Sequence, residues 1–230
     1  MRRLLLAAML ALGIPSLGEA APCLSQTLQD YINLGSGGCT VGAALFADFS
    51  STTLSPFATE IPAGDVNVSP LVTGIGLAFG LDVSAGPGDL FDILIRYAVS
   101  GPLSFVANSL AMSGSAAAGD GVVTAVEDTC LGGTFAGPGP VSCSGTPMTL
   151  IVFDIGSDQG LFATTAPPLY APTSFFDVFT EIAVDGGVAG TAELRGVVTS
   201  EFTEVPEPST FVLIGSGLAG IAARRRRQRG

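Results

Sequence analysis

The sequence predicts an all-β body, an antiparallel β-sandwich of the jelly-roll or immunoglobulin-like kind, between an N-terminal signal peptide and a short C-terminal transmembrane helix. Three observations support this fold class. Apolar residues alternate with small or polar ones in several segments, 31 glycines and 15 prolines mark frequent turns, and no long amphipathic helical pattern occurs. The 230 residues divide into a signal peptide (1–20), an acidic body (21–204) and a tail (205–230).

The composition excludes several classes of function. The chain has no His, so it cannot form a Ser-His-Asp or Cys-His nucleophile or a His-ligated zinc site. The body holds 18 acidic residues against two arginines, Arg96 and Arg195, which gives it a net charge of −16. Because such a surface repels phosphate backbones, we expect no nucleic acid partner.

The N-terminus has the three regions of a signal peptide. Arg2 and Arg3 form a positive start, and Leu4–Leu12 is an apolar run too short to span a bilayer. Small residues occupy Gly18 and Ala20, the positions that signal peptidase requires before its cleavage site. The sequence therefore predicts export, with cleavage between Ala20 and Ala21.

In the body, the residues Leu28–Ile32 predict a short helix that is followed by an edge strand. Apolar residues then alternate from Leu71 to Val83 and from Phe91 to Val99, which predicts two half-buried strands. The turn residues Ser84–Gly88 between them predict a hairpin, in a register that brings the two apolar faces together.

A second hairpin is predicted around the turn residues Asp185–Gly187, with strands over 176–184 and 188–198. Its register places Asp177 opposite Arg195, a favourable cross-strand charge pair. Further strands are predicted at Val41–Phe49, Leu103–Ser113, Val122–Asp128 and Met148–Ile155, for about eight strands in total.

The four cysteines agree with export, since thiols pair into disulfides in an oxidising compartment. Four cysteines can be connected in three ways, and we favour the connectivity whose two bridges close short local loops. Each bridge would contribute about 3 kcal/mol in the chain-entropy model. A metal site would need CxxC spacing or His partners, so neither a metal nor another cofactor is expected. The favoured pairs are Cys23–Cys39 and Cys130–Cys143.

Candidate chemistry in the body is sparse. A glycosidase needs two carboxylates across a cleft, and the candidate pairs are Asp89 with Asp92 and Glu127 with Asp128. Residues 154–160 resemble a calcium loop only faintly, since Gly156 takes the place of an expected Asp or Asn. Solvated strand ends and a turn explain these residues more simply, and we predict that the protein is not an enzyme.

The tail after Glu204 has three parts: a Pro-rich motif (205–210), an uncharged helix (210–223) and an Arg cluster (224–229). The prolines end the folded body. The helix would be about 20 Å long, short of a hydrocarbon core of about 30 Å unless flanking residues extend it or the bilayer thins. The Arg cluster fixes the tail on the cytoplasmic side and the body outside. Its members are Arg224, Arg225, Arg226, Arg227 and Arg229.

This order of parts resembles the PEP-CTERM sorting signal of Gram-negative bacteria. The match lies in Pro206, Glu207 and Pro208, followed by the short apolar helix and the terminal arginines. The resemblance covers about a tenth of the chain. It implies that the protein is a substrate of exosortase, a membrane-embedded protease-transpeptidase, and that the three motif residues serve recognition rather than catalysis.

Three classes of function follow. The first is a structural or interaction protein that is sorted by its tail to the cell surface, or to the extracellular matrix of a biofilm. The second is a carbohydrate-binding module of the extracellular polysaccharide, which would present exposed aromatic residues on a sheet face. The third is a glycosidase, whose paired carboxylates would converge in a cleft. The first class fits the sparse polar chemistry best.

Overall fold

The computed structural model describes residues 20–156, 160–163 and 169–205. This part of the chain is all-β, as predicted, with twelve strands and one short α-helix. The elements are β1 (Gln26–Thr27), α1 (Leu28–Asn33), β2 (Cys39–Val41), β3 (Ala44–Thr52), β4 (Thr59–Glu60), β5 (Asn67–Pro70), β6 (Ile75–Ala85), β7 (Leu90–Ala118), β8 (Val122–Leu131), β9 (Thr146–Ile155), β10 (Gly160–Ala163), β11 (Thr173–Asp185) and β12 (Thr191–Val205).

All twelve strands belong to one hydrogen-bonded sheet. Its main order is β1-β5-β6-β12-β7-β11-β8-β9-β10, with β3 and β4 also paired to β7 and β2 paired to β3. Every strand pair is antiparallel except β4–β7. The path begins at β1 and ends at β10, so within the described chain the sheet is open.

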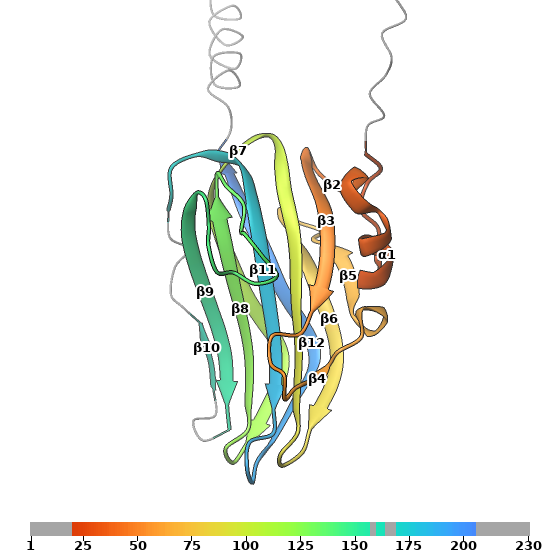
Figure 1. The fold of residues 1–230 in the computed structure, drawn as a ribbon, viewed down its shortest axis with the longest axis vertical. Coiled ribbons are helices and arrows are strands. Elements are labelled where there is room, and N and C mark those ends of the chain that lie inside the picture. Colours follow the sequence, from red (N-terminus) through yellow and green to blue (C-terminus); the bar gives the residue numbers. More distant parts are fainter. Residues whose placement is uncertain (1–19, 157–159, 164–168, 206–230) are drawn as a thin grey trace, which may run out of the picture.

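The long strand β7 belongs to two layers. Residues 90–100 pair with β11 and β3, whereas residues 104–118 pair with β12. The sheet therefore folds over on itself at the bend between these two parts, as Figure 1 shows. We call β2, β3, the first part of β7, β11, β8, β9 and β10 the first layer. The second layer consists of β5, β6, β12 and the second part of β7.

Apolar side chains that alternate along the strands fill the space between the layers. The ring of Tyr97 in the first layer contacts Phe79 in the second, and Phe176 in the first layer contacts Phe202 in the second, with ring centroids 6.0 and 4.7 Å apart. All four side chains are almost fully buried. Burying each such ring stabilises the fold by roughly 1.5–3 kcal/mol relative to its exposure.

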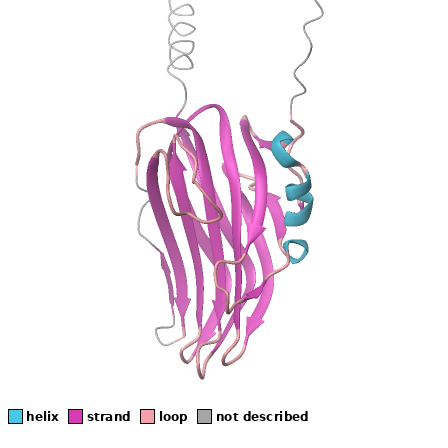
Figure 2. Cartoon of the chain, viewed as in Figure 1, coloured by secondary structure: helices cyan, strands magenta, loops and turns pink. Residues whose placement is uncertain are grey.

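The short helix α1 packs against one side of the first layer. Figure 2 shows that the helical segments of the described chain lie together on this side of the strands. A capping box starts it: the Asp30 amide donates to the Thr27 hydroxyl, and the Thr27 amide donates to the Asp30 carboxylate. Tyr31 is buried with its ring 5.0 Å from that of Phe49. The predicted short helix before a strand is thus confirmed.

Both predicted disulfides are confirmed. Cys23–Cys39 joins the start of the body to β2, and Cys130–Cys143 ties the loop after β8 back to that strand. The second bridge borders a small separate core on the outer face of the first layer, where Phe135 packs on Phe179.

The four additional predicted strands are confirmed, with some changes of bounds. Val41–Phe49 is interrupted by a turn at Gly42, where φ is +61°. The segments Phe91–Val99 and Leu103–Ser113 are parts of the single strand β7.

Both predicted hairpins are wrong. β6 pairs with β5 and β12 rather than with β7, and β11 pairs with β7 and β8 rather than with β12. In each case the turn crosses from one layer to the other, so the apolar faces of the two strands meet through the core instead of side by side. Arg195 therefore lies opposite Asp82 in β6, and Asp177 pairs with Arg96 in β7.

These two turns and the turn between β7 and β8 meet at one end of the molecule. The Gly186 amide donates to the Asp89 carbonyl (2.9 Å), and the Val188 amide donates to the Asp120 carboxylate (2.9 Å). The start of the described chain and Val205 both lie at the opposite end (Figure 1). No helix in the described chain is long and apolar enough to cross a membrane. The predicted signal peptide, apart from Ala20, and the predicted transmembrane helix lie outside the described residues.

Candidate functional site: the end of β12 and its surroundings

The last strand of the body is anchored three residues before it ends. Phe202 is buried, and its ring lies near those of Phe46 (6.2 Å), Phe105 (6.2 Å) and Phe176 (4.7 Å). Beyond it the last three residues of β12 are exposed, and Val205 still pairs with Ser104. The folded body thus extends through Val205, the first residue of the predicted tail, and ends directly before Pro206.

The predicted sorting residues Pro206, Glu207 and Pro208, and the arginines from Arg224 to Arg229, lie outside the described residues. The predicted signal cleavage site is described. The Ala21 carbonyl accepts a hydrogen bond from the Thr40 amide (2.9 Å), so the expected start of the mature chain is attached to β2.

The members of each candidate carboxylate pair have different surroundings. Glu127 and Asp128 are neighbours on β8, so their side chains point to opposite faces of the sheet. Asp92 is buried on the first layer, where its Oδ2 accepts hydrogen bonds from the Thr53 hydroxyl (2.7 Å) and the Leu54 amide (2.8 Å). Asp89 lies in the turn after β6 and accepts from the Gly86 amide.

In the faint calcium-loop match, Asp154 accepts a hydrogen bond from the Ser115 hydroxyl (2.8 Å), and residues 157–159 lie outside the described chain. Among the described residues, no group of three or more carboxylate or thiol side chains is placed to hold a metal ion.

A buried polar cluster lies between the layers, and sequence reasoning missed it. The Asn108 amide donates to Glu127 Oε1 (2.6 Å) and to the Thr129 hydroxyl (3.3 Å), and the Tyr97 hydroxyl donates to Ser200 (2.9 Å). All five side chains are fully buried. Burial raises the pKa of Glu127 to about 7, against the opposite effect of Ser200 and Asn108. The sequence signal that could have revealed this cluster is the presence of polar residues at strand positions whose alternation predicts that they face the core.

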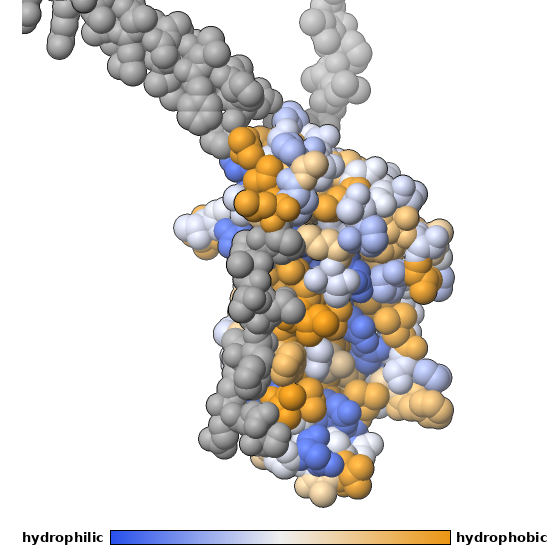
Figure 3. All heavy atoms as spheres, turned by 90° about the vertical axis from the view of Figure 1, so that its left-hand side faces the viewer, coloured by the Kyte–Doolittle hydropathy of each residue, from blue (hydrophilic) through white to orange (hydrophobic). Residues whose placement is uncertain are grey.

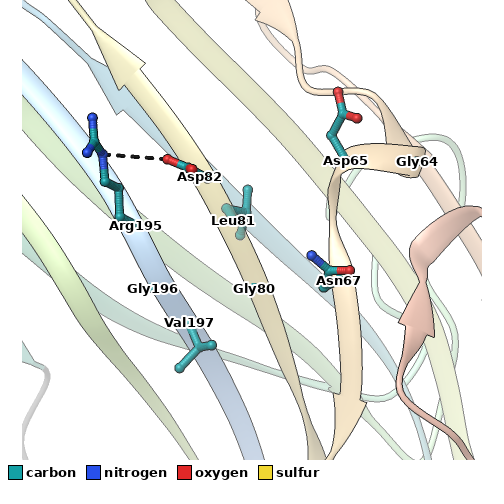
Figure 4. Close-up of a pocket in the computed structure, with 9 residues that line it drawn as sticks. All are labelled: Gly64, Asp65, Asn67, Gly80, Leu81, Asp82, Arg195, Gly196 and Val197. Atoms are coloured by element: carbon teal, nitrogen blue, oxygen red, sulfur yellow. Dashed lines mark ion pairs between the residues drawn. The ribbon is translucent and has the colours of Figure 1, made fainter.

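A shallow hollow of about 650 Å³ lies on the outer face of the second layer. Figure 4 shows Asp82 of β6 and Arg195 of β12 joined across it, with Asp65 and Asn67 on the other side. The Arg195 Nε lies 3.5 Å from Asp82 and 3.3 Å from Glu193, and both Arg195 and Asp82 are largely exposed. The nine residues that line the hollow include no aromatic side chain.

Comparison with known proteins identifies one part of the chain. Residues 204–227 match the family model described as the PEP-CTERM protein-sorting motif. No curated protein and no solved structure matches the chain. The fold and the tail thus define an all-β protein with a C-terminal sorting motif. The chain carries the PEP-CTERM motif predicted from its tail, and this motif marks an exported protein that exosortase processes.

Proposed function

We propose that the protein is displayed at the cell surface or in the extracellular matrix, and that its body is a structural or interaction module rather than an enzyme. The observation that carries this proposal is the match at residues 204–227, which begins at the end of β12. In the sequence, Pro206–Pro208 follow the last strand of the body directly, and we assign them the role of the recognition segment. The opposite orientation of Glu127 and Asp128 on β8 supports a body without hydrolytic chemistry.

The proposed sequence of events has three steps. Signal peptidase cleaves between Ala20 and Ala21 during export. The helix over 210–223 then holds the precursor in the inner membrane, with its arginines on the cytoplasmic side. Exosortase recognises Pro206–Pro208, removes the tail and passes the body on to the surface or to the matrix of a biofilm.

Within this proposal the folded-over sheet is a β-sandwich of the jelly-roll or immunoglobulin-like kind, supported by its two layers around a shared core. Binding of extracellular polysaccharide is the second candidate role of the body. The hollow between Asp65 and Arg195 offers polar side chains on an outer sheet face for hydrogen bonds to a sugar, although its lining lacks the aromatic residues expected of a carbohydrate-binding module. Loss of polysaccharide retention in an Arg195→Ala variant, with processing unchanged, would distinguish this role from a purely structural one.

The sorting proposal is tested by changing Pro206, Glu207 and Pro208 together to Ala in the full chain, in cells that contain exosortase. We expect the variant to be exported and to stay uncleaved and membrane-bound, because the apolar run and the arginines are intact. The matched control changes Ser209 and Thr210 to Ala, which leaves the tripeptide in place and should preserve processing. Release of the triple variant at the wild-type rate would reduce the motif to a linker.

A second arm removes Arg224–Arg229. Without these charges the short helix loses its cytoplasmic anchor, so the precursor should leave the membrane before it is processed. Fractionation of cells that lack exosortase measures this directly. A precursor that stays fully in the membrane fraction would contradict the assigned role of the arginines.

A further inference from the structure

An exposed apolar surface surrounds the point where the described chain ends. Leu169 is 83% exposed and Val205 is 39% exposed, beside prolines that are also exposed. Figure 3 shows hydrophobic side chains at this end of the molecule, continuous with others that run down the same face. We call this set the tail-side surface, and its members are Pro102, Leu169, Pro172 and Val205.

Hydrogen bonds hold the three segments of the tail-side surface next to one another. Val205 of β12 pairs with Ser104 along one edge of β7, just after the bend. Along the other edge Thr173 pairs with Phe105, and the Tyr170 amide donates to the Val106 carbonyl (2.9 Å). The start of the second part of β7 therefore holds the other two segments on either side of it.

The sequence after Val205 limits how far this surface can lie from a membrane. Five residues separate Val205 from Phe211, the first residue of the apolar run that continues to Ala223. Val205 and Phe211 are thus six residue steps apart, and a fully extended chain between them spans at most about 22 Å. With the run inserted as proposed above, the tail-side surface is held within that distance of the lipid.

The acidic residues of the body are distributed so that the end with the tail-side surface approaches anionic lipid more easily than the opposite end. Two acidic side chains, Glu201 and Glu204, lie near the end of β12. Five acidic residues lie on or beside the turns at the opposite end, so that end is repelled more strongly by anionic lipid headgroups. They are Asp89, Asp120, Asp154, Asp185 and Glu193.

We propose that the tail-side surface rests in the headgroup region of the lipid bilayer while the precursor awaits exosortase. Leu169 and Val205 would then bury their apolar surface at the boundary between headgroups and acyl chains. The body would stand on the membrane with its turn cluster facing outward. This inference rests on the proposed membrane insertion of the tail.

The absence of Trp from the sequence provides a clean probe. Leu169→Trp places a single indole on the tail-side surface, and Val188→Trp places one on the turn cluster at the opposite end. The two positions are matched, since they are 83% and 87% exposed. Each full-length precursor is reconstituted into phosphatidylethanolamine–phosphatidylglycerol vesicles that contain brominated acyl chains, and Trp fluorescence is recorded.

We expect bromine to quench the Leu169→Trp variant at least about twofold more strongly than the Val188→Trp variant, with a blue-shifted emission, because only the first indole reaches the acyl boundary. Equal quenching of the two would overturn the inference. Vesicle flotation separates this result from a failure of the proposed function. Protein that floats without selective quenching refutes the docking surface alone, whereas protein that does not float refutes tail insertion and the docking with it.

A protein partner is the competing occupant of this surface. The same vesicles are therefore prepared with and without exosortase. Selective quenching in lipid alone supports docking on the bilayer. A blue shift that appears only with exosortase, without quenching by lipid, would assign the surface to the enzyme and overturn the lipid proposal.

Discussion

Arg96 and Asp177, 81 residues apart in sequence, form a bidentate ion pair on the outer face of the first layer. The Arg96 Nε lies 3.0 Å from Asp177 Oδ1, and its Nη2 lies 2.5 Å from Oδ2. The same two side chains hold the loop after β8: Asp177 accepts from the Phe135 amide (2.9 Å) and Arg96 donates to the Phe135 carbonyl (2.9 Å). The pair thereby fixes the loop that carries Cys143 over the small outer core.

Replacing Asp177 with Asn should destabilise the body by about 2–4 kcal/mol, since it leaves a partly buried guanidinium and the Phe135 amide without their charged partner. Urea unfolding of the oxidised protein measures the loss. The control is Asp82→Asn, which breaks a largely exposed pair with Arg195 and should cost under about 1 kcal/mol. Equal losses in both variants would show that the Arg96–Asp177 geometry adds nothing.

The buried carboxyl of Glu127 should make stability depend on pH. Its pKa rises from an ordinary value of 4.5 to about 7 in the folded state. Between these values the folded protein keeps a proton that the unfolded chain releases, so stability falls as pH rises through this window. The total loss is on the order of 3 kcal/mol.

Glu127→Gln should reduce this dependence, because the amide keeps the shape of the protonated acid; burial also raises the pKa of Glu181, which leaves a smaller slope of the same sign. The variant should show a smaller difference in its unfolding urea concentration between pH 5 and pH 8 than the wild type, and at pH 8 it should exceed wild-type stability. Glu60→Gln, at an exposed position on β4, serves as the control and should keep the wild-type slope. A wild-type slope in Glu127→Gln would show that other groups cause the dependence.

Two neighbouring glycines should respond differently to Ala. Gly38 has a φ of +54°, and a Cβ there would lie 2.1 Å from the Phe46 carbonyl oxygen, so Gly38→Ala should cost about 2–4 kcal/mol. A Cβ on Gly37 would meet nothing within 4 Å, and Gly37→Ala should change stability by no more than about 0.5 kcal/mol. Thermal unfolding of both variants measures the two losses. Equal losses would show that the close approach of Gly38 to β3 does not require glycine at this position.

The exported protein should begin at Ala21 and contain no free thiol. Mass spectrometry after alkylation of the unreduced protein should show no modified cysteine, and four modified cysteines would contradict both bridges. Changing Cys130 and Cys143 together to Ser should cost about 3 kcal/mol, since the opened loop gains entropy in the unfolded chain.

The alternation of apolar residues predicted which residues face the core but not which strands are neighbours. Val184 and Val198 are both buried. Their burial is required both by a hairpin and by two opposed layers, so it does not distinguish the two arrangements. Side-chain period reports the face of a strand, whereas pairing depends on where each turn takes the chain. The turn at Asp185–Gly187 was therefore recognised, while its crossing between layers was not.

The sorting tail was predictable because its signal is local: a few adjacent residues in a fixed order carry it. The buried polar cluster has no such local pattern. Glu127 and Asn108 are 19 residues apart and lie on different layers, so only the folded sheet brings the carboxyl and the amide together. The small outer core was missed for the same reason, since Leu94 and Phe179 face outward beneath a distant loop.

The place of β12 in the sheet also determines how the body bears a mechanical load. β12 pairs with β6 on one side and with β7 on the other along most of its length, and it leads directly into the tail. Tension applied through Val205 acts along the strand, while the ladder hydrogen bonds run perpendicular to it. Both ladders are therefore strained together in shear and cannot open one bond at a time. A chain pulled from this end, by flow or by a translocating machine, would resist extraction with the combined strength of both ladders.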